Sequence, residues 1–241
     1  MTSSHHLLAT NPRAGKRQWR ALLVAAAALA ATCAQAAIPA TERQALLTLY
    51  RSTQGDQWTV RTGWLGPAGS ECSWTGVTCD AAGQHVVAVK LINNQLRGTL
   101  PALGALRELQ VLNVALNHLR GPLPSLRGLG QLRVLKANNN LLSGPLPQLN
   151  AAPRLERLQL ANNALSGSLR HGASQQALRV VDVSNNQFSG PMPSLADMPQ
   201  LRRFDASFNR LSGAAPTGHH PDAVLELEGN RLHNSPPTGG S

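Results

Sequence analysis

The chain has 241 residues, of which only 3% are aromatic, and its formal net charge is +10. Four basic residues lie within the first 20 positions, which contain no acid, so the remainder holds 18 basic and 12 acidic residues, a charge of +6. This excess is small and no basic run carries interleaved aromatic residues, which excludes nucleic acid as the expected partner. The scarcity of aromatic residues fits a thin core filled by aliphatic side chains.

Residues 1–36 have the three regions of a secretory signal peptide. A polar, basic start is followed by the uncharged apolar stretch Ala21 to Ala31, and then by the small residues of an A-x-A cleavage site, Ala34-Gln35-Ala36. The apolar stretch is too short to cross a bilayer. We therefore predict cleavage near Ala36, no stable membrane span after it, and a secreted or periplasmic, cell-envelope location. Lipidation of Cys33 is a less favoured alternative.

Residues 37–85 do not repeat and are expected to form an amino-terminal cap. Thr41 and Gln44 have the spacing of a capping box, and the apolar residues after them have the period of one short amphipathic helix. Cys72 and Cys79 follow, separated by six residues. An even pair of cysteines in an exported protein predicts a disulfide, which we prefer to a zinc or redox site. The cap would cover the open end of the first repeat.

One pattern recurs through residues 86–234, and its clearest copy, Leu109 to Leu119, reads L-x-x-L-x-L-x-x-N-x-L. Its asparagines recur every 23 residues, with a last step of 21, at Asn94, Asn117, Asn140, Asn163, Asn186, Asn209 and Asn230. This period and spacing are the leucine-rich repeat signature. We predict an α/β-type repeat solenoid of seven coils, with a parallel concave β-sheet and an irregular or 3-10 convex side. Residues 235–241 are expected to be a disordered tail.

The L-x-L step of each repeat predicts a short strand whose two apolar side chains point inward. The predicted inward pairs are Val89 and Leu91, Leu112 and Val114, Leu135 and Ala137, Leu158 and Leu160, Val181 and Val183, Phe204 and Ala206, and Leu225 and Leu227. The asparagine ends the strand, where an amide with donors and an acceptor can bridge successive coils. We interpret the asparagine row as structural and not as a binding site.

The segment from Cys72 to Cys79 spells C-x-W-x-G-V-x-C. It resembles the amino-terminal cap of plant-type leucine-rich repeat proteins, which include receptor-kinase ectodomains and polygalacturonase-inhibiting proteins. The repeats agree, because residues 119–124 match the plant pattern L-x-G-x-(I/L)-P. Two departures stand out: each coil is one residue shorter after the proline, and residues 168–172 lose the motif. No kinase pattern is visible, and the Ala- and Arg-rich composition is typical of a bacterial source.

The outward residues between the paired apolar positions are expected to form the central row of the concave face. From the first coil to the last, this row reads Lys90, Asn113, Lys136, Gln159, Asp182, Asp205 and Glu226. The row is basic at its amino end and acidic at its carboxy end, and Arg157 and Arg203 lie two positions before it. One interpretation is a binding face for an extended, dipolar partner whose cations meet the acids. The other is neutralisation by Arg157 and Arg203 within the face, since such exposed pairs contribute only about 0–1 kcal/mol.

Enzyme chemistry has little support in the sequence, which shows no catalytic triad, phosphate loop or zinc motif. His219, His220 and Asp222 have a spacing that a metal site could use, but a surface loop is the preferred interpretation. Leu116 and Phe208, at strand ends, are either exposed anchors or, as we prefer, rim packing. We predict no catalysis, no cofactor and no metal.

The expected function is recognition of a protein or peptide ligand through the concave face, and the acidic carboxy-terminal half favours a basic ligand. The family resemblance implies an alternative, inhibition of a secreted glycan-cleaving hydrolase. A polysaccharide-binding envelope or adhesion protein is a third hypothesis, although such binders usually expose aromatic residues.

Overall fold

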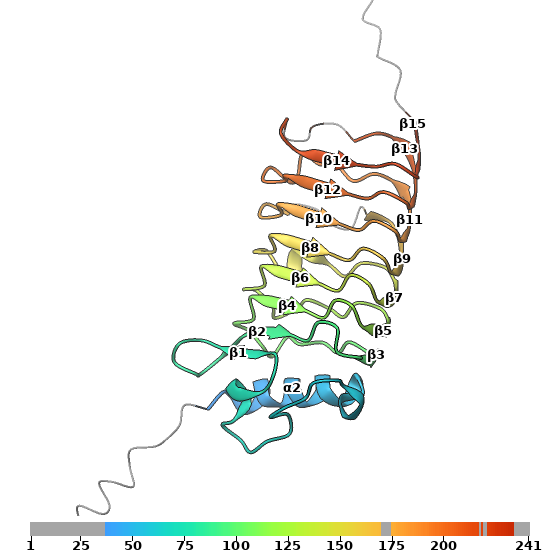
Figure 1. Ribbon diagram of the computed structural model, residues 1–241. Helices are drawn as coiled ribbons and strands as arrows, with labels where there is room; N and C mark the ends of the chain where they lie inside the picture. Colours follow the sequence, from blue (N-terminus) through green and yellow to red (C-terminus); the bar gives the residue numbers. More distant parts are fainter. Residues whose placement is uncertain (1–36, 170–174, 217, 219–220, 234–241) are drawn as a thin grey trace, which may run out of the picture. The chain divides into compact units, whose positions relative to one another are not determined.

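The computed structural model describes residues 37–169, 175–216, 218 and 221–233. The predicted signal peptide, the predicted tail, His219 and His220 lie outside these residues. The described residues belong to one compact unit, in which coils stack one above another and each coil contributes a strand to each of two sheets (Figure 1). The predicted leucine-rich repeat solenoid is therefore confirmed.

The first sheet carries the strands that the L-x-L pattern predicts. Within the described residues it has eight strands, in the order β1 (Val77–Cys79), β2 (Val86–Lys90), β4 (Val111–Asn113), β6 (Val134–Lys136), β8 (Arg157–Gln159), β10 (Val180–Asp182), β12 (Arg203–Asp205) and β14 (Val224–Glu226). The strand β1 comes from the cap and pairs antiparallel with β2, whereas all later neighbours pair in parallel. The repeats thus form one continuous parallel sheet that begins on a cap strand.

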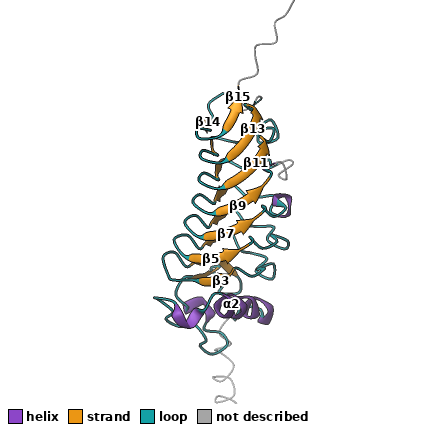
Figure 2. Ribbon diagram, turned by 90° about the vertical axis from the view of Figure 1, so that its right-hand side faces the viewer, coloured by secondary structure: helices purple, strands orange, loops and turns teal. Residues whose placement is uncertain are grey.

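A second parallel sheet runs along the stack, where the sequence predicted only an irregular or 3-10 side. Within the described residues its strands are β3 (Arg97–Thr99), β5 (His118–Gly121), β7 (Leu141–Gly144), β9 (Ala164–Gly167), β11 (Gln187–Pro191), β13 (Arg210–Ala214) and β15 (Arg231–His233) (Figure 2). Each of the first six includes the glycine that follows the repeat asparagine by four positions, with φ between +74° and +87°. An L-side chain is strained at such a φ, so this glycine turns the chain at each coil.

The core consists of the inward apolar pairs, which are buried in the first six coils. In the last described coil Leu225 and Leu227 are only partly buried, because no further coil among the described residues packs against them. The outward side chains of the same strands alternate with these pairs and form the face considered below.

The asparagine side chains bridge successive coils. The amide of Asn117 donates to the carbonyl of Val114 in its own coil at 2.9 Å and to that of Leu91 in the preceding coil at 2.8 Å. Its oxygen accepts the backbone N–H groups of Asn94 and Leu96, at 2.9 and 3.0 Å. Every later asparagine of the row donates to the preceding coil and accepts from it in the same way. The side chain of Asn94 instead bonds the cap. Its oxygen accepts the backbone N–H of Val60 at 2.6 Å, and its amide donates to the carbonyl of Val60 at 2.8 Å.

The cap contains the helix α2 (Ala40–Ser52), which packs Leu46 and Leu49 fully against the core. The predicted capping box is wrong, because the helix begins at Ala40 after Pro39, and no side chain caps its first turn. Thr41 is therefore already inside the helix, and the amide of Gln44 donates to the hydroxyl of Thr48 one turn later. The fixed φ of Pro39, −53°, starts the helix without a side-chain acceptor.

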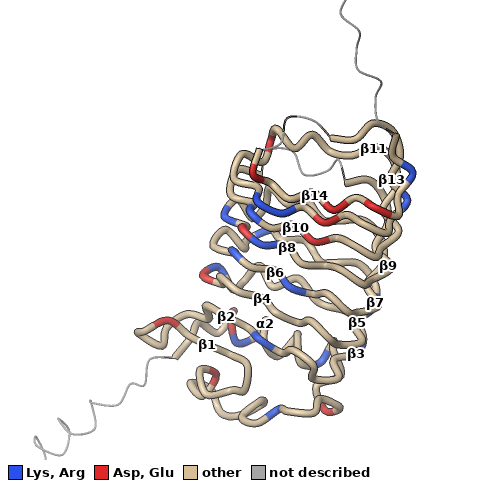
Figure 3. The backbone as a smooth tube through the Cα atoms, turned by 45° about the horizontal axis from the view of Figure 1, so that its top comes forward, with Lys and Arg blue, Asp and Glu red and all other residues tan. Residues whose placement is uncertain are grey.

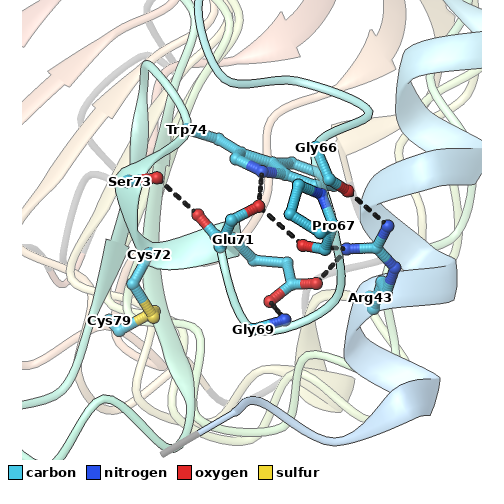
Figure 4. Close-up of polar contacts among 10 residues, drawn as sticks. Arg43, Gly66, Pro67, Gly69, Glu71, Cys72, Ser73, Trp74 and Cys79 are labelled. Atoms are coloured by element: carbon cyan, nitrogen blue, oxygen red, sulfur yellow. Dashed lines mark hydrogen bonds and ion pairs between the residues drawn. A yellow bond between two sulfur atoms is a disulfide. The ribbon is translucent and has the colours of Figure 1, made fainter. Parts of the chain in front are cut away.

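One polar network and one disulfide join the parts of the cap. Glu71 is 1% exposed and is paired with Arg43 of α2, whose guanidinium also donates to the carbonyl of Gly66 at 2.7 Å and lies over the ring of Trp74 (Figure 4). Cys72 and Cys79 form the disulfide, with Cα atoms 5.4 Å apart. These contacts fix the loop that supports the first sheet at its amino end.

Helix α2 is also tied to the first repeat. Glu42 is 3% exposed and accepts the backbone N–H of Val86 at 2.8 Å and an imidazole nitrogen of His85 at 2.7 Å. The hydrogen bond to Glu42 outweighs desolvation and raises the pKa of His85. A charged His85 therefore strengthens the junction between helix and sheet.

The core at the fourth coil, where the sequence loses the proline motif, contains a buried polar side chain and a small void. Positions 23 residues apart place Leu106, Leu129, Ala152, Gln175 and Met198 in one buried row. Gln175 is 1% exposed, and neither its amide nitrogen nor its oxygen has a hydrogen-bond partner among the described residues. An apolar void of about 20 Å³, lined partly by Leu169, Leu178 and Met198, lies in the same region.

Candidate functional site

The outward row predicted from the sequence is continuous in the first sheet. Strand register pairs each of its members with the next, in the order Lys90, Asn113, Lys136, Gln159, Asp182, Asp205 and Glu226. Neighbouring strands lie about 4.8 Å apart, so the side chains of adjacent members are within reach of one another. Basic residues occur toward the cap and acidic residues over β10, β12 and β14, as the tube view shows (Figure 3).

Two aspartates of this row each accept hydrogen bonds from the serine two residues later. In Asp182-Val183-Ser184, the carboxylate Oδ1 accepts the hydroxyl of Ser184 at 2.7 Å and its backbone N–H at 3.2 Å. In the next coil Asp205 accepts from Ser207 at 2.7 and 3.1 Å. The serine thereby fixes the orientation of each carboxylate and occupies one of its two oxygens, which leaves the other oxygen to face outward contacts.

Asp205 is much less accessible than the sequence suggested, because only 7% of its surface is exposed. Arg203 lies 3.6 Å from its carboxylate and 2.9 Å from that of Glu226. Burial alone would raise the pKa of Asp205, but the hydrogen bonds from Ser207 and the nearby Arg203 prevail and lower it. The side-chain hydrogen bond with Asp205 in turn raises the pKa of Glu226. The pKa values of the two carboxyl groups therefore shift in opposite directions.

The two interpretations of the acidic end therefore apply to different residues. Arg203 compensates Asp205 and Glu226 within the face, as the second interpretation expects. Asp182 has no ion pair within 4 Å among the residues that the structure describes, and neither has the exposed Arg157 on the neighbouring strand β8. The unpaired charges of this face thus include Arg157 and Asp182 at its centre, on β8 and β10.

The rows beside the central one are small or half-buried near that centre. Ala115, Ala161 and Ser184, two positions after the central row, are buried, and Val134 and Val180 on the other side are half-buried. These short side chains leave the polar atoms of the central row, together with the exposed Arg157 of β8, as the outward groups on β6 to β10. A ligand backbone can therefore approach the sheet closely there.

Leu116 and Phe208 occupy a position at which the backbone is left-handed in every coil. Asparagine fills it at Asn93, Asn139, Asn162 and Asn185, as expected for a residue that tolerates this conformation. Phe208 is 54% exposed, yet its ring covers the next coil, because a methyl group on Gly229 would lie 2.6 Å from it. The geometry of Phe208 thus agrees with rim packing, whereas Leu116 is 47% exposed.

Within the described residues, no group of three His, Cys, Asp or Glu side chains could hold a metal ion. In the same part of the chain, no helix combines the length and the apolar character that crossing a membrane requires.

Comparisons with known proteins agree with the cap and the repeats. A family model described as "Leucine rich repeat N-terminal domain" matches residues 39–80, and one described as "Leucine Rich Repeat" matches residues 177–198. A curated protein of Arabidopsis thaliana, "Probable inactive leucine-rich repeat receptor-like protein kinase", is 38% identical over 71 residues, or 29% of this chain. That match spans about a tenth (10%) of the curated relative's own length.

Solved structures match most of the chain. The crystal structure of a Pollen Receptor Kinase 3 has a TM-score of 0.62 and 30% sequence identity over 70% of this chain and 85% of that chain. The structure of PEPR1–AtPEP1 has a TM-score of 0.66 and 26% identity, covering 80% of this chain and 28% of that one. Cap, disulfide, asparagine row and double sheet define a leucine-rich repeat protein with a plant-type amino-terminal cap. The chain belongs to the plant-type leucine-rich repeat family of receptor-kinase-like ectodomains.

Proposed function

We propose that this chain is an exported, non-catalytic recognition module that binds a protein or peptide across the outward face of the first sheet. The observation that carries the proposal is the central cluster of Lys136, Arg157, Gln159 and Asp182, which lies on three adjacent strands in register. Arg157 and Asp182 are charged and form no ion pair with the described part of the chain. Charges left unpaired on a face are available to a partner.

The chemistry of the cluster favours an extended ligand with both charges. Ser184 occupies Oδ1 of Asp182, so Oδ2 is the atom that would accept an ammonium or guanidinium group of the ligand. Arg157 and Lys136 would meet its carboxylate or carbonyl groups. The amide of Gln159, between them, can donate to and accept from a ligand backbone. Asp205 and Glu226 contribute less, because Arg203 already satisfies them.

The comparison with PEPR1–AtPEP1 supports this class of function, since that related fold was solved as a complex. The hydrolase inhibitor and the polysaccharide binder remain alternatives for the nature of the partner, and the test separates them from a peptide or protein ligand.

The test is affinity capture from extracellular extracts with the wild-type chain and the variant Arg157→Gln/Asp182→Asn. The matched control is Arg210→Gln/Asp197→Asn, which makes the same two chemical changes at exposed positions outside the first sheet. We expect the wild type and the control to retain one partner that the first variant loses, with at least a ten-fold weaker Kd by calorimetry. Equal capture by all three proteins contradicts the proposal. A captured glycan, or a captured hydrolase that the chain inhibits stoichiometrically, selects the corresponding alternative.

A further inference from the structure

A second polar site lies away from the first sheet, at the amino end of the second sheet. A hollow of about 310 Å³ is lined by Gln54, Arg97, Gly98, His118 and Arg120. This volume is at the lower end of the range of ligand pockets, roughly 300–1,000 Å³. Three of the five lining residues carry nitrogen donors on basic side chains, and no lining residue is acidic. The wall of the hollow is therefore suited to an anion.

Strand register brings the basic side chains together. Arg97 of β3 pairs with His118 of β5, and Arg120 lies two residues after His118, so all three side chains point to the same face of the second sheet. All three residues are exposed. Like charges on neighbouring strands destabilise a sheet, and among the described residues neither Arg97 nor Arg120 has an ion pair that would offset this repulsion.

Nearby groups that could neutralise the arginines are already engaged. Asp56, close in sequence to Gln54, accepts hydrogen bonds from Tyr50 and Arg61. The carbonyl of Thr53, directly after α2, accepts Trp58 Nε1 and the backbone N–H of Arg97. The carboxylate of Asp56 and the carbonyl of Thr53 thus already have other donors, whereas the carbonyl of Ser52 lies close to Gly98 at the hollow.

The repeat itself shows that these arginines are not required by the fold. The position of Arg97 and Arg120, one residue before the glycine, is serine in the next four coils: Ser143, Ser166, Ser189 and Ser212. Those coils form the same sheet with the same glycine turn. The arginines are confined to the two coils that border the hollow.

The backbone at the hollow is also held in place. Gly98 has a φ of +87°, and a methyl group there would lie 2.3 Å from the carbonyl oxygen of Ser52. The end of α2 therefore approaches β3 closely, which brings Gln54 to the edge of the hollow. Gln54 adds an amide that can donate a further hydrogen bond.

We propose that this hollow is an oxyanion site that takes a phosphate or sulfate group. Two guanidinium forks, an imidazole and an amide offer more donors than the two oxygens of one carboxylate accept, whereas a phosphate or sulfate monoester presents three terminal oxygens. The site lies on the second sheet and does not involve the recognition cluster of the first.

The experiment is calorimetric titration of the full chain at constant ionic strength with inorganic phosphate, inorganic sulfate, phosphoserine and acetate. The test variant is Arg97→Ser/Arg120→Ser, which installs the residue that the repeat uses elsewhere. The control is Arg210→Ser/Arg231→Ser, which removes the same charge from two exposed arginines at the far end of the same sheet. Thermal unfolding of all three proteins verifies that they are folded.

We expect saturable 1:1 binding of phosphate or sulfate to the wild type and the control, and at least a ten-fold loss of affinity in the test variant. Tighter binding of phosphoserine than of inorganic phosphate identifies an ester on a larger ligand as the natural group, and equal binding identifies the free anion. Equal affinities in the test and control variants, tighter binding of acetate than of phosphate and sulfate, or no saturable binding overturn the proposal.

Discussion

The substitution Gln175→Met is expected to stabilise the protein. Gln175 occupies a core position that is apolar in the coils before and after it, and both polar atoms of its buried amide lack partners among the described residues. Burying such an amide without hydrogen bonds costs about 1–3 kcal/mol in proteins. Methionine has nearly the same length, fills irregular gaps and occurs at the equivalent position, Met198. The predicted gain in the free energy of unfolding is therefore about 1–3 kcal/mol.

For a domain of this size, a gain of this magnitude raises Tm by about 2–12 °C, which thermal unfolding followed by circular dichroism resolves. The control is Gln200→Met, the same change at an exposed position, where we expect an effect within about 0.5 kcal/mol. An unchanged or lowered Tm for Gln175→Met refutes the reasoning, because it means that the amide has a stabilising partner.

Three further changes test other parts of the structure. Asn140→Ala leaves the carbonyls of Val114 and Ala137 and the N–H of Leu119 without their side-chain partner. In urea unfolding it should lower the free energy of unfolding by at least about 2 kcal/mol, whereas Asp182→Ala should lower it by under about 1 kcal/mol. Similar losses for the two variants contradict the assignment of inward and outward residues. The raised pKa of His85 predicts that its bond to Glu42 contributes stability fully below the ordinary histidine pKa of about 6.5, and that this contribution is lost as pH rises through the folded-state pKa. Stability curves of the wild type and His85→Ala from pH 5.5 to 9 should converge at the alkaline end, and a constant gap argues against the linkage. In Gly98→Ala the new methyl group sits at a φ of +87° and 2.3 Å from the carbonyl oxygen of Ser52, so we expect a lower Tm. The control Gly130→Ala places its methyl group in open space. Equal Tm values for the two variants contradict the close approach of α2.

The repeat architecture could be predicted because its causes are local and recur. The L-x-L step determines which side chains point inward, and the asparagine is the side chain that can both donate to and accept from two coils, as Asn117 does. Seven copies of this pattern define the stack without knowledge of long-range contacts. The disulfide between Cys72 and Cys79 could be predicted because an exported chain with an even pair of cysteines is expected to oxidise them.

Features that depend on how coils pack against each other could not be predicted in this way. The second sheet arises because residues after the asparagine fall beside their equivalents in the next coil, although their sequences, such as Arg97–Thr99, show no strand alternation. The sequence placed Asp205 on an open face, but Ser207, Arg203 and Glu226 surround it. The expected capping box is absent because α2 starts at Ala40, directly after Pro39, whose fixed φ suits the entry into a helix.

The basic hollow was missed for a different reason. The L-x-L pattern predicts outward residues for the first sheet only. His118 instead lies in β5 beside Arg97 and Arg120. The signal was present in the repeat, because arginine occupies in two coils a position that serine occupies in four.

The most direct test of the central claim is photo-crosslinking of the captured partner to a photoreactive amino acid placed in the chain. It would be placed at Gln159, in the centre of the first sheet, and in a second protein at Ser189, on the exposed face of the second sheet. The account predicts a crosslinked product from position 159 and none from position 189. A product from position 189 alone would contradict it and would place recognition on the second sheet.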